Sequence, residues 1–494
     1  MYFVSTRGKE RVIGSEAVVK GLAADGGLFV PETFPTVTAG DINAMRSMSY
    51  AERAAEILHR FFDEYDKAEL LAACKAAYGQ FERGDAAPLV KIKDGLYVLE
   101  LFHGPTCAFK DMALTVLPYL LRKGCDLCGI KEKVLVLVAT SGDTGKAALE
   151  GFKNAEGIDV MVLYPEDGVS KMQKLQMCTQ EGSNVNVLAV SGNFDDCQRT
   201  VKTIFSSKEY AEQLAKEGYR LSSANSINFG RLAPQIVYYF STYIDLLTGK
   251  QIEYGDPVNF TVPTGNFGDI LAAYYAKRMG LPLGKLICAS NRNHILTDFF
   301  QSGVYDTHRE FIKTMSPSMD ILVSSNLERL LYEITDRNAE RTAELMRSLS
   351  QSGKYEVTPG ELARLQGEIW AGFAGEDETI EAMYDFFSEN GYTADTHTGV
   401  ALYVQGLYKD AFPRDKNESV IVSTANPYKF PQDVYYAVTG NDIKDSFKCI
   451  KRLNQETAMP VPKAISRLRD KPLRFKKSAP ASKVFDEVLA FVKR

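Results

Sequence analysis

The chain has 494 residues, of which 58 are lysine or arginine and 63 are aspartate or glutamate, so its formal net charge is −5. Hydrophobic residues make up 45% and charged residues 24%, ordinary values for a folded globular protein, which excludes disorder as the dominant state. The mildly acidic balance argues against a nucleic-acid partner, because proteins that bind nucleic acids usually carry a strong positive charge.

Neither a membrane nor a metal is indicated as a partner. No apolar run approaches the roughly 20 residues that a membrane-spanning helix requires, and the first residues lack the basic and apolar regions of a secretory signal. Eight cysteines are too few for a disulfide scaffold in a chain of this length, which favours a reducing compartment. Cys125 and Cys128 form one CxxC pair, only half of an ordinary zinc site. We therefore expect a cytoplasmic protein without a bound metal.

The first 90 residues are predicted to be mainly helical. Residues 21–27 form a glycine-rich turn that enters a short apolar strand, and Pro31 ends the regular pairing of that strand. From Tyr50 to Ala77, alanine, leucine and phenylalanine recur at helical spacing among charged residues. This spacing predicts a helical segment over the whole stretch.

From about residue 91, short apolar strands alternate with amphipathic helices. Several of the strands are continuous apolar runs, as is typical of strands buried on both faces. Such alternation predicts parallel sheets with right-handed crossovers, and the number of strands suggests two sheets. The expected strands are Leu96–Leu101, Val134–Ala139, Val160–Tyr164, Val185–Val190, Asn259–Pro263, Leu286–Ser290 and Val420–Thr424.

Residues from about 300 to 390 are richer in helix. Thr358 and Glu361 form a capping box, with Pro359 at the first helical position. The helix that this box opens is expected to carry the apolar residues Leu362, Leu365, Ile369 and Trp370.

The first of three glycine-containing turns at strand ends lies at residues 139–145. In open α/β sheets, ligands bind at the carboxyl ends of the strands, and the helix that follows this turn favours an anion at its N-terminus. Gly145 and Lys146 are similar to the end of an ATP-binding phosphate loop. Thr140 and Ala147, however, stand where that loop needs glycine and serine or threonine, so an ATPase is excluded. By itself the turn is an anion site or a plain strand–helix connection.

The second turn, residues 264–269, follows the strand that starts at Asn259 and opens another helix. Gly280 and Pro282 stop that helix. The turn suits a phosphate group, but it is not GxGxxG, so the dinucleotide-binding fingerprint is absent. Taken alone, it too is a phosphate cradle or a plain connection.

The third turn carries Lys110 at the start of an apolar stretch that contains Leu114 and Leu117. Burying an ammonium group costs several kcal/mol unless the group is neutralised or paired. A buried lysine has a lowered pKa and can act as a nucleophile that forms a Schiff base. The alternative is a lysine that reaches the surface or pairs with Asp111. A Schiff-base lysine and two glycine loops for anions are together what a pyridoxal phosphate enzyme needs.

The residues that carry these features resemble the threonine synthase family, whose members are pyridoxal phosphate enzymes of the tryptophan-synthase-β structural type. The resemblance extends from residue 5 to about 431 and keeps the family's order of motifs. It looks like the longer form of the family, and Asn426 stands where the family more often has histidine. The matching stretches are residues 5–8, 21–31, 103–111, 140–145, 225–228, 263–269 and 423–431.

The resemblance implies how the cofactor would be held. By similarity, Lys110 is the catalytic residue and binds pyridoxal 5′-phosphate through a Schiff base. Thr424 offers its hydroxyl to the pyridine nitrogen. The phosphate group of the cofactor is expected in a cup formed by Gly265, Asn266, Phe267, Gly268 and Asp269.

The resemblance also implies the reaction, which converts O-phospho-L-homoserine and water into L-threonine and phosphate. Lys110, released from the Schiff base, would move protons at Cα and Cβ as general base and acid. The phosphate at Cγ would leave, and water would add at Cβ. The substrate α-carboxylate is expected in the loop of Ser141, Gly142, Asp143, Thr144 and Gly145.

Two matters stay open from the sequence. The substrate phosphate needs a second basic site, for which the candidates are His103, Lys171, Arg231, Asn326 and Arg329. The runner-up function is a phospho-lyase that releases phosphate and 2-oxobutyrate. A third possibility is a non-catalytic protein that binds phosphate ligands on the same scaffold, against which the presence of Lys110 argues.

We predict an α/β fold of two doubly wound, mostly parallel-sheet domains that face a cofactor cleft, with mainly helical extensions at both ends. The expected parts are an N-terminal domain at 1–90, a large cofactor-binding domain at 91–120 and 225–440 with a helical insertion at about 300–390, a small α/β domain at 121–224, and a C-terminal segment at 441–494. We expect a monomer or a homodimer.

Overall fold

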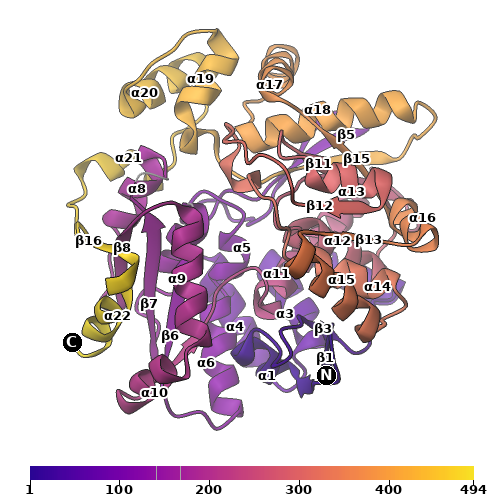
Figure 1. The fold of residues 1–494 in the computed structure, drawn as a ribbon. Helices are drawn as coiled ribbons and strands as arrows, with labels where there is room; N and C mark the ends of the chain where they lie inside the picture. Colours follow the sequence, from indigo (N-terminus) through magenta and orange to yellow (C-terminus); the bar gives the residue numbers. More distant parts are fainter. Residues whose placement is uncertain (141, 167–168) are drawn as a thin grey trace.

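The computed structural model describes residues 1–140, 142–166 and 169–494, and in these ranges the strands form sheets of six, five, three and two strands. The two large sheets stand on opposite sides of the molecule, and α5 (Asp111–Leu114) and α11 (Phe229–Thr248) lie between them (Figure 1). The prediction of an α/β protein with two mostly parallel sheets is therefore confirmed.

The six-stranded sheet has the order β14-β11-β10-β15-β5-β4 and is parallel except for β4 at its edge. In the chain, β4 and β5 precede the first four strands of the five-stranded sheet, whereas β10, β11, β14 and β15 follow them. The strands are β4 (Leu89–Lys93), β5 (Leu96–Glu100), β10 (Val258–Pro263), β11 (Leu283–Ser290), β14 (Ile369–Phe373) and β15 (Glu418–Ser423). Its neighbouring helices include α12 (Gly268–Arg278), α13 (Ile295–Ser302) and α18 (Thr396–Ala411).

The five-stranded sheet has the order β16-β8-β7-β6-β9 and is parallel throughout. Its strands are β6 (Lys133–Ala139), β7 (Ile158–Pro165), β8 (Val185–Ser191), β9 (Tyr219–Ser222) and β16 (Ser478–Pro480). The helices of this half are α7 (Asp143–Gly151), α8 (Lys171–Cys178), α9 (Phe194–Ser206), α10 (Lys208–Lys216) and α22 (Val484–Val492).

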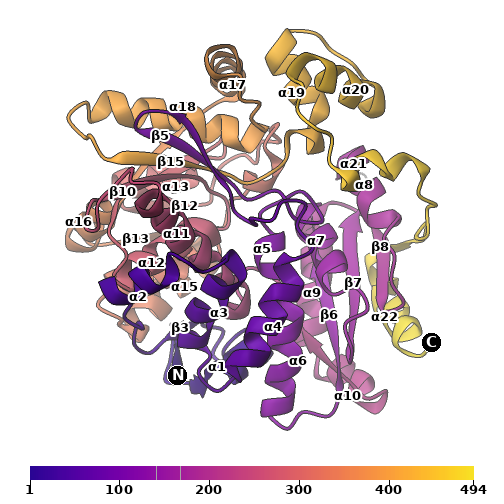
Figure 2. The same cartoon turned by 180° about the vertical axis from the view of Figure 1, so that it is seen from behind.

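Each large sheet buries one face in a shared core and the other face under its own helices. In β6, Val134, Val136 and Val138 belong to the shared core, whereas Leu135 and Leu137 pack on the opposite face with α9 and α22. Figure 1 shows α9 in front of this sheet, and Figure 2 shows the molecule from behind with α7 on the other face. Because both faces are buried, β6 is a continuous apolar run from Val134 to Ala139.

The N-terminal region is less uniform than predicted. An antiparallel sheet of β1 (Tyr2–Ser5), β2 (Arg11–Ile13) and β3 (Phe29–Pro31) precedes most of its helices. The helical stretch expected from Tyr50 to Ala77 forms as two helices, because the first ends at Phe61 and Asp66 caps the second through the N–H groups of Ala68 and Glu69. The helices are α1 (Gly14–Lys20), α2 (Ala39–Met45), α3 (Tyr50–Phe61), α4 (Lys67–Tyr78) and, after Lys110, α6 (Leu117–Leu127).

The helix expected to include Ile369 and Trp370 ends earlier than predicted. The capping box at Thr358 forms, but α16 (Pro359–Glu368) stops before Ile369, which begins β14. Parallel pairing with β11 determines this outcome, since Ile369 lies opposite Leu286. The other elements of this insertion are α14 (Leu327–Ile334), α15 (Ala339–Ser352), α17 (Glu376–Asn390) and the antiparallel pair β12 (Val304–Asp306) and β13 (Lys354–Glu356).

The last 54 residues are mainly helical, as predicted, and one short strand among them joins the five-stranded sheet. After α19 (Pro431–Thr439), α20 (Ser446–Thr457) and α21 (Lys463–Ser466), the chain returns to the five-stranded sheet, where β16 pairs with β8 and α22 covers the outer face. The domain boundaries at residues 90, 120, 224 and 440 stay a prediction. No helix in the described ranges is long and apolar enough to cross a membrane.

The capping box of α16 allows a test of local stability. Thr358 Oγ1 accepts a hydrogen bond from the N–H of Glu361 at 3.2 Å, and the Glu361 carboxylate accepts one from the N–H of Thr358 at 2.7 Å. Thr358→Ala should lower the free energy of unfolding by about 1 kcal/mol, as measured by urea denaturation. The exposed Ser350→Ala in α15, whose hydroxyl bonds only to the carbonyl of Arg347, serves as the control. Equal stability of the two variants would contradict this role of the box.

Candidate active site

Lys110 lies between the two large sheets, immediately before α5, where it is half-buried. Among the residues that the structure describes, its Nζ forms no ion pair or hydrogen bond within the protein, and it lies 4.8 Å from the centre of the Phe109 ring. Burial lowers the pKa of Lys110 to about 8, although the nearby Asp143 carboxylate opposes this shift. The structure therefore holds a reactive amine at the position where the sequence predicts one.

The end of β15 lies directly beside this lysine. The N–H of Phe109 donates to the carbonyl of Thr424 at 2.8 Å, and Ala108 pairs with Ala425 in an isolated bridge. Thr424 is buried, with only 6% of its surface exposed. These contacts bring the predicted ring-nitrogen residue next to the predicted Schiff-base residue.

The second glycine turn connects β10 to α12. Phe267 adopts a left-handed conformation with φ of 65°, and Gly268 begins the helix, so the first N–H groups of α12 have no helical partner. At Gly265 a Cβ atom would lie 2.8 Å from the carbonyl oxygen of Ser318, so no side chain fits there. The carbonyl of Asn266 accepts bonds from both the backbone and the side-chain amide of Asn326, each at 3.1 Å. The turn is thus a rigid backbone cradle.

One carboxylate oxygen of Asp269 contacts α11, and the other has no partner among the described residues. Its Oδ1 accepts hydrogen bonds from the hydroxyls of Tyr238 and Tyr239, the second at 2.8 Å. Burial raises the pKa of Asp269 to about 6, and the charge of Lys110 acts in the opposite direction. The glycine turn and Lys110 therefore belong to one electrostatic environment, as a shared site requires.

The first glycine turn, between β6 and α7, is organised by Thr140. Its Oγ1 accepts hydrogen bonds from the N–H groups of Gly142 and Gly145, both at 2.9 Å. Gly142 has a φ of 144°, which L side chains rarely adopt. Thr144 lies in the first turn of α7. Ser141, the first residue of the predicted substrate loop, lies outside the described residues.

Asp143 is the centre of a buried polar network. Its Oδ1 is 2.9 Å from Lys429 Nζ and accepts a bond from Gln173 Nε2 at 3.1 Å, while its Oδ2 accepts one from Ser318 Oγ at 3.3 Å. The cations Lys429 and Lys110 hold the pKa of Asp143 well below its usual range, although burial alone would raise it. Since Ser318 also packs against Gly265, this network joins the two glycine turns.

Sequence reasoning missed four residues of this region, namely Gln173, Ser318, His397 and Lys429. The N–H of Ser318 donates to His397 Nε2 at 3.2 Å, and His397 Nδ1 pairs with Asp395 at 2.7 Å, which fixes the loop that carries Ser318. Lys429 lies inside the stretch 423–431 that matches the family, and a lysine among apolar residues there could have indicated a buried, paired side chain. The other three come from distant segments, and no local pattern points to them.

Of the five candidates for a second phosphate site, only Arg231 is a buried cation whose donors are largely unused. Its side chain is 5% exposed, one nitrogen donates to the carbonyl of Ala224 at 2.9 Å, and Nε has no partner among the described residues. Burial lowers the pKa of Arg231 to about 10. The guanidinium of Arg329 instead donates hydrogen bonds to Asn326 and to the backbone carbonyls of Phe29 and Ile227.

The remaining candidates are less suitable. His103 Nε2 is 2.7 Å from Glu100, which already supplies an anion, and Lys171 is exposed at the start of α8. Asn326 bonds to the carbonyl of Asn266 and accepts a bond from Arg329.

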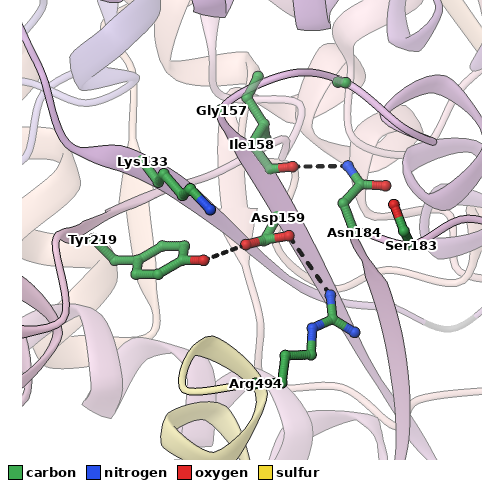
Figure 3. Close-up of a pocket in the computed structure, with 9 residues that line it drawn as sticks. Lys133, Gly157, Ile158, Asp159, Ser183, Asn184, Tyr219 and Arg494 are labelled. Atoms are coloured by element: carbon green, nitrogen blue, oxygen red, sulfur yellow. Dashed lines mark hydrogen bonds and ion pairs between the residues drawn. The ribbon is translucent and has the colours of Figure 1, made fainter.

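A polar pocket of about 250 Å³ lies far from these residues, at the amino ends of β6, β7 and β9 (Figure 3). Lys133, Asn184 and Arg494 line it around Asp159, which accepts a hydrogen bond from the hydroxyl of Tyr219. The loops described above follow the carboxyl ends of the strands, where ligands bind in such sheets. The pocket is therefore not part of the candidate site.

Comparisons with known proteins agree with this geometry. A family model described as "Threonine synthase N terminus" matches residues 2–78, and one described as "Pyridoxal-phosphate dependent enzyme" matches residues 85–367. Threonine synthase of Pseudomonas aeruginosa is 38% identical over 445 residues, which cover 89% of this chain and 91% of that one. Human threonine synthase-like 1 is 40% identical over 448 residues, but the chain spans only 59% of that relative.

Solved structures give the same result. The crystal structure of pyridoxal-phosphate-bound threonine synthase from Brucella melitensis has a TM-score of 0.89 and 37% identity, covering 100% of both chains. The yeast threonine synthase structure has a TM-score of 0.88 and 32% identity, covering 100% of this chain and 98% of that one.

The fold, the lysine between two glycine turns and the second family model define a pyridoxal-phosphate-dependent enzyme, so the cofactor is pyridoxal phosphate. Within that class, the chain belongs to the threonine synthase family.

The residues present fit this cofactor. Lys110 offers an amine without a partner among the described residues, and the first N–H groups of α12, directly after the second glycine turn, have no helical partner and can donate to a phosphate. Thr424 stands close to Lys110, as a contact to the pyridine ring requires. In the described part of the chain, no cluster of three or more histidine, cysteine, aspartate or glutamate side chains could hold a metal ion.

Proposed function

We propose that the chain converts O-phospho-L-homoserine and water into L-threonine and phosphate. Membership of the threonine synthase family supports this activity, and the observation that carries it is the position of Lys110, a partly desolvated amine within the electrostatic reach of both glycine turns. When bound, pyridoxal phosphate supplies an electron sink for negative charge that develops beside the α-carbon of an amino acid.

Lys110 has two tasks in this proposal. Its amine binds the aldehyde carbon of the cofactor, for which the neutral form is needed, and the pKa of about 8 makes that form accessible near neutral pH. When it is not bound to the cofactor, the same amine would accept the protons that leave Cα and Cβ, and it would return protons at Cγ, which becomes a methyl group, and at Cα once water has added at Cβ. The half-buried setting limits the access of water to this amine.

The backbone of Gly265, Asn266, Phe267, Gly268 and Asp269 would hold the cofactor phosphate. The free N–H groups at the start of α12 and the positive end of its dipole favour an anion there. In this arrangement Asp269 would contribute its backbone N–H, while its Oδ1 accepts hydrogen bonds from Tyr238 and Tyr239 and its Oδ2 has no partner among the described residues.

The loop of Ser141, Gly142, Asp143, Thr144 and Gly145 would bind the substrate α-carboxylate. The N-terminus of α7 provides the donors, and Thr140 fixes the turn from behind. The Asp143 side chain does not bind the carboxylate in this arrangement, because its oxygens face Lys429, Gln173 and Ser318.

Arg231 would bind the phosphate of the substrate. It is a buried cation, and its Nε has no acceptor among the described residues. Gln235, one turn further along α11, donates to the carbonyl of Arg231 at 2.8 Å and lies beside Gly268, so the backbone of Arg231 lies close to the second glycine turn. An arginine suits a phosphate because its planar fork donates two parallel hydrogen bonds.

Thr424 would contact the pyridine nitrogen, which its hydroxyl can do without protonating it. Thr424→Asp should raise the proton affinity of that nitrogen and so change which products form. We expect less threonine and a larger share of side products, with the cofactor still bound, as measured by chromatography of the products. Thr424→Ser keeps the hydroxyl and should keep the product ratio. An unchanged ratio and spectrum in Thr424→Asp would place this residue away from the ring.

Incubation of the purified holoenzyme with O-phospho-L-homoserine tests the proposed function. Threonine and phosphate should form in equal amounts. If 2-oxobutyrate is the main product, the chain is a phospho-lyase; if the substrate binds without turnover, it is a binding protein. We also propose that the protein is cytoplasmic and is a monomer or a homodimer. Measurement of the molecular mass of the holoenzyme in solution tests the oligomeric state.

A further inference from the structure

One buried ion pair connects the two halves of the molecule at the candidate site. Lys429 lies in a short 3₁₀ turn, Pro427–Lys429, that follows β15 of the six-stranded sheet, whereas Asp143 begins α7 on the five-stranded sheet. Their side chains are 1% and 3% exposed, and Nζ lies 2.9 Å from Oδ1. The pair therefore reaches from one sheet to the other without access to water.

The partners of this pair are themselves residues of the site. Lys429 Nζ also donates to the carbonyl of Thr106 at 3.0 Å. Thr106 in turn holds Asp111, the residue after Lys110, through its N–H at 2.8 Å and its hydroxyl at 2.6 Å. A displacement of Lys429 would thus disturb both the turn that carries Lys110 and the loop at the start of α7.

Lys429 neutralises the negative charge of Asp143, which would otherwise oppose the binding of an anion in the same loop. Under the proposed function, the loop that contains Asp143 receives the α-carboxylate of the substrate. A second carboxylate in the same desolvated loop repels that anion unless a cation neutralises it. Among the described residues, Lys429 is the cation within ion-pair distance of Asp143. Lys146 on the same helix is paired with Glu150 at 2.8 Å instead.

We propose that Lys429 is a positioning residue, which neutralises Asp143 and fixes the carboxylate-binding loop to the six-stranded sheet so that the loop accepts the α-carboxylate of an amino acid. This inference rests on the proposed function of the loop. It assigns to Lys429 a role in substrate selection without any contact to the reacting atoms.

The test compares two amines that differ only in a carboxylate, L-2-aminobutyrate and propylamine. Each is titrated into the holoenzyme, and binding is followed through the visible absorbance of the cofactor. The unaltered protein should prefer the amino acid. In Lys429→Met the affinity for L-2-aminobutyrate should fall about 10- to 100-fold, because the Asp143 charge is left unpaired, while the affinity for propylamine stays the same. In steady-state assays the loss should appear in KM more than in kcat.

Two further variants separate charge from packing. Lys429→Arg keeps the cation and should keep the preference for the carboxylate. The double variant Lys429→Met with Asp143→Asn removes both charges and should regain most of the preference that Lys429→Met loses. Lys146→Met breaks a buried pair on the same helix and should leave the preference unchanged.

The results of these variants distinguish failure of the inference about Lys429 from failure of the proposed threonine synthase activity. If Lys429→Met is too unstable to purify, the comparison of the double variant with the unaltered protein decides. Loss of the preference in the double variant, or its retention in Lys429→Met, would overturn the inference. A lack of preference in the unaltered protein would overturn both the inference and the assignment of the loop. Absence of threonine formation, with the preference intact, would overturn the activity alone.

Discussion

Replacement of Lys110 by alanine should abolish threonine formation, with a loss of at least about a thousandfold in turnover. The reason is that one amine serves as cofactor anchor and as proton carrier, and no other lysine is placed to replace it: Lys429 and Lys146 are held in ion pairs. The visible absorbance of the Schiff base should disappear together with the activity. Phosphate release from O-phospho-L-homoserine measures the first effect, and an absorbance spectrum of the purified variant measures the second.

Lys123→Ala is the control for this variant. Lys123 lies on α6, and its Nζ pairs with Glu69 at 2.6 Å on the surface. Its replacement should leave turnover within about twofold, because surface ion pairs contribute little. Full activity and an unchanged spectrum in Lys110→Ala would show that another residue binds the cofactor.

Arg231→Met should raise the KM for O-phospho-L-homoserine about 100- to 1000-fold and change kcat much less. The substrate phosphate would lose a buried cationic partner, and the methionine would leave that anion desolvated without compensation. Cofactor binding should persist, because the glycine cradle and Lys110 are intact. Initial rates over a range of substrate concentrations provide both constants.

The exposed Arg199→Met in α9, whose side chain is 72% exposed, is the matched control and should change neither constant. A second readout is inhibition by inorganic phosphate, which should weaken in Arg231→Met in parallel with KM. If KM stays the same while the cofactor is lost, Arg231 acts on the cofactor and not on the substrate.

The sequence predicted the parts of the fold that depend on local pattern. The strands around Val134 and Val420 are apolar runs, the strand around Asn259 also contains Thr261, and each was found close to its expected position. The capping box at Thr358 also formed as expected, because its hydrogen bonds lie within one turn of helix. The lysine and the glycine turns were recognised because they follow such strands.

Other features depend on contacts between distant residues, which local pattern does not contain. Ile369 continues an apolar helical spacing, yet pairing with β11 makes it a strand residue. β16 joins β8 across almost 290 residues of chain, and the short sequence Ser478–Pro480 gives no sign of this partner. Asp143 was expected as a residue of the carboxylate-binding loop, and no local pattern indicates that its side chain pairs with Lys429, which is 286 positions away in the sequence. The roles proposed for the individual site residues stay predictions.

Turnover in water enriched in the heavy isotope of oxygen tests the central claim most directly. If water adds at Cβ after phosphate has left from Cγ, the isotope should appear in the hydroxyl of threonine, and the released phosphate should keep its original oxygens. Mass spectrometry of both products, formed by the holoenzyme from O-phospho-L-homoserine, measures this distribution. Isotope in the phosphate together with homoserine, or 2-oxobutyrate in place of threonine, would contradict the account.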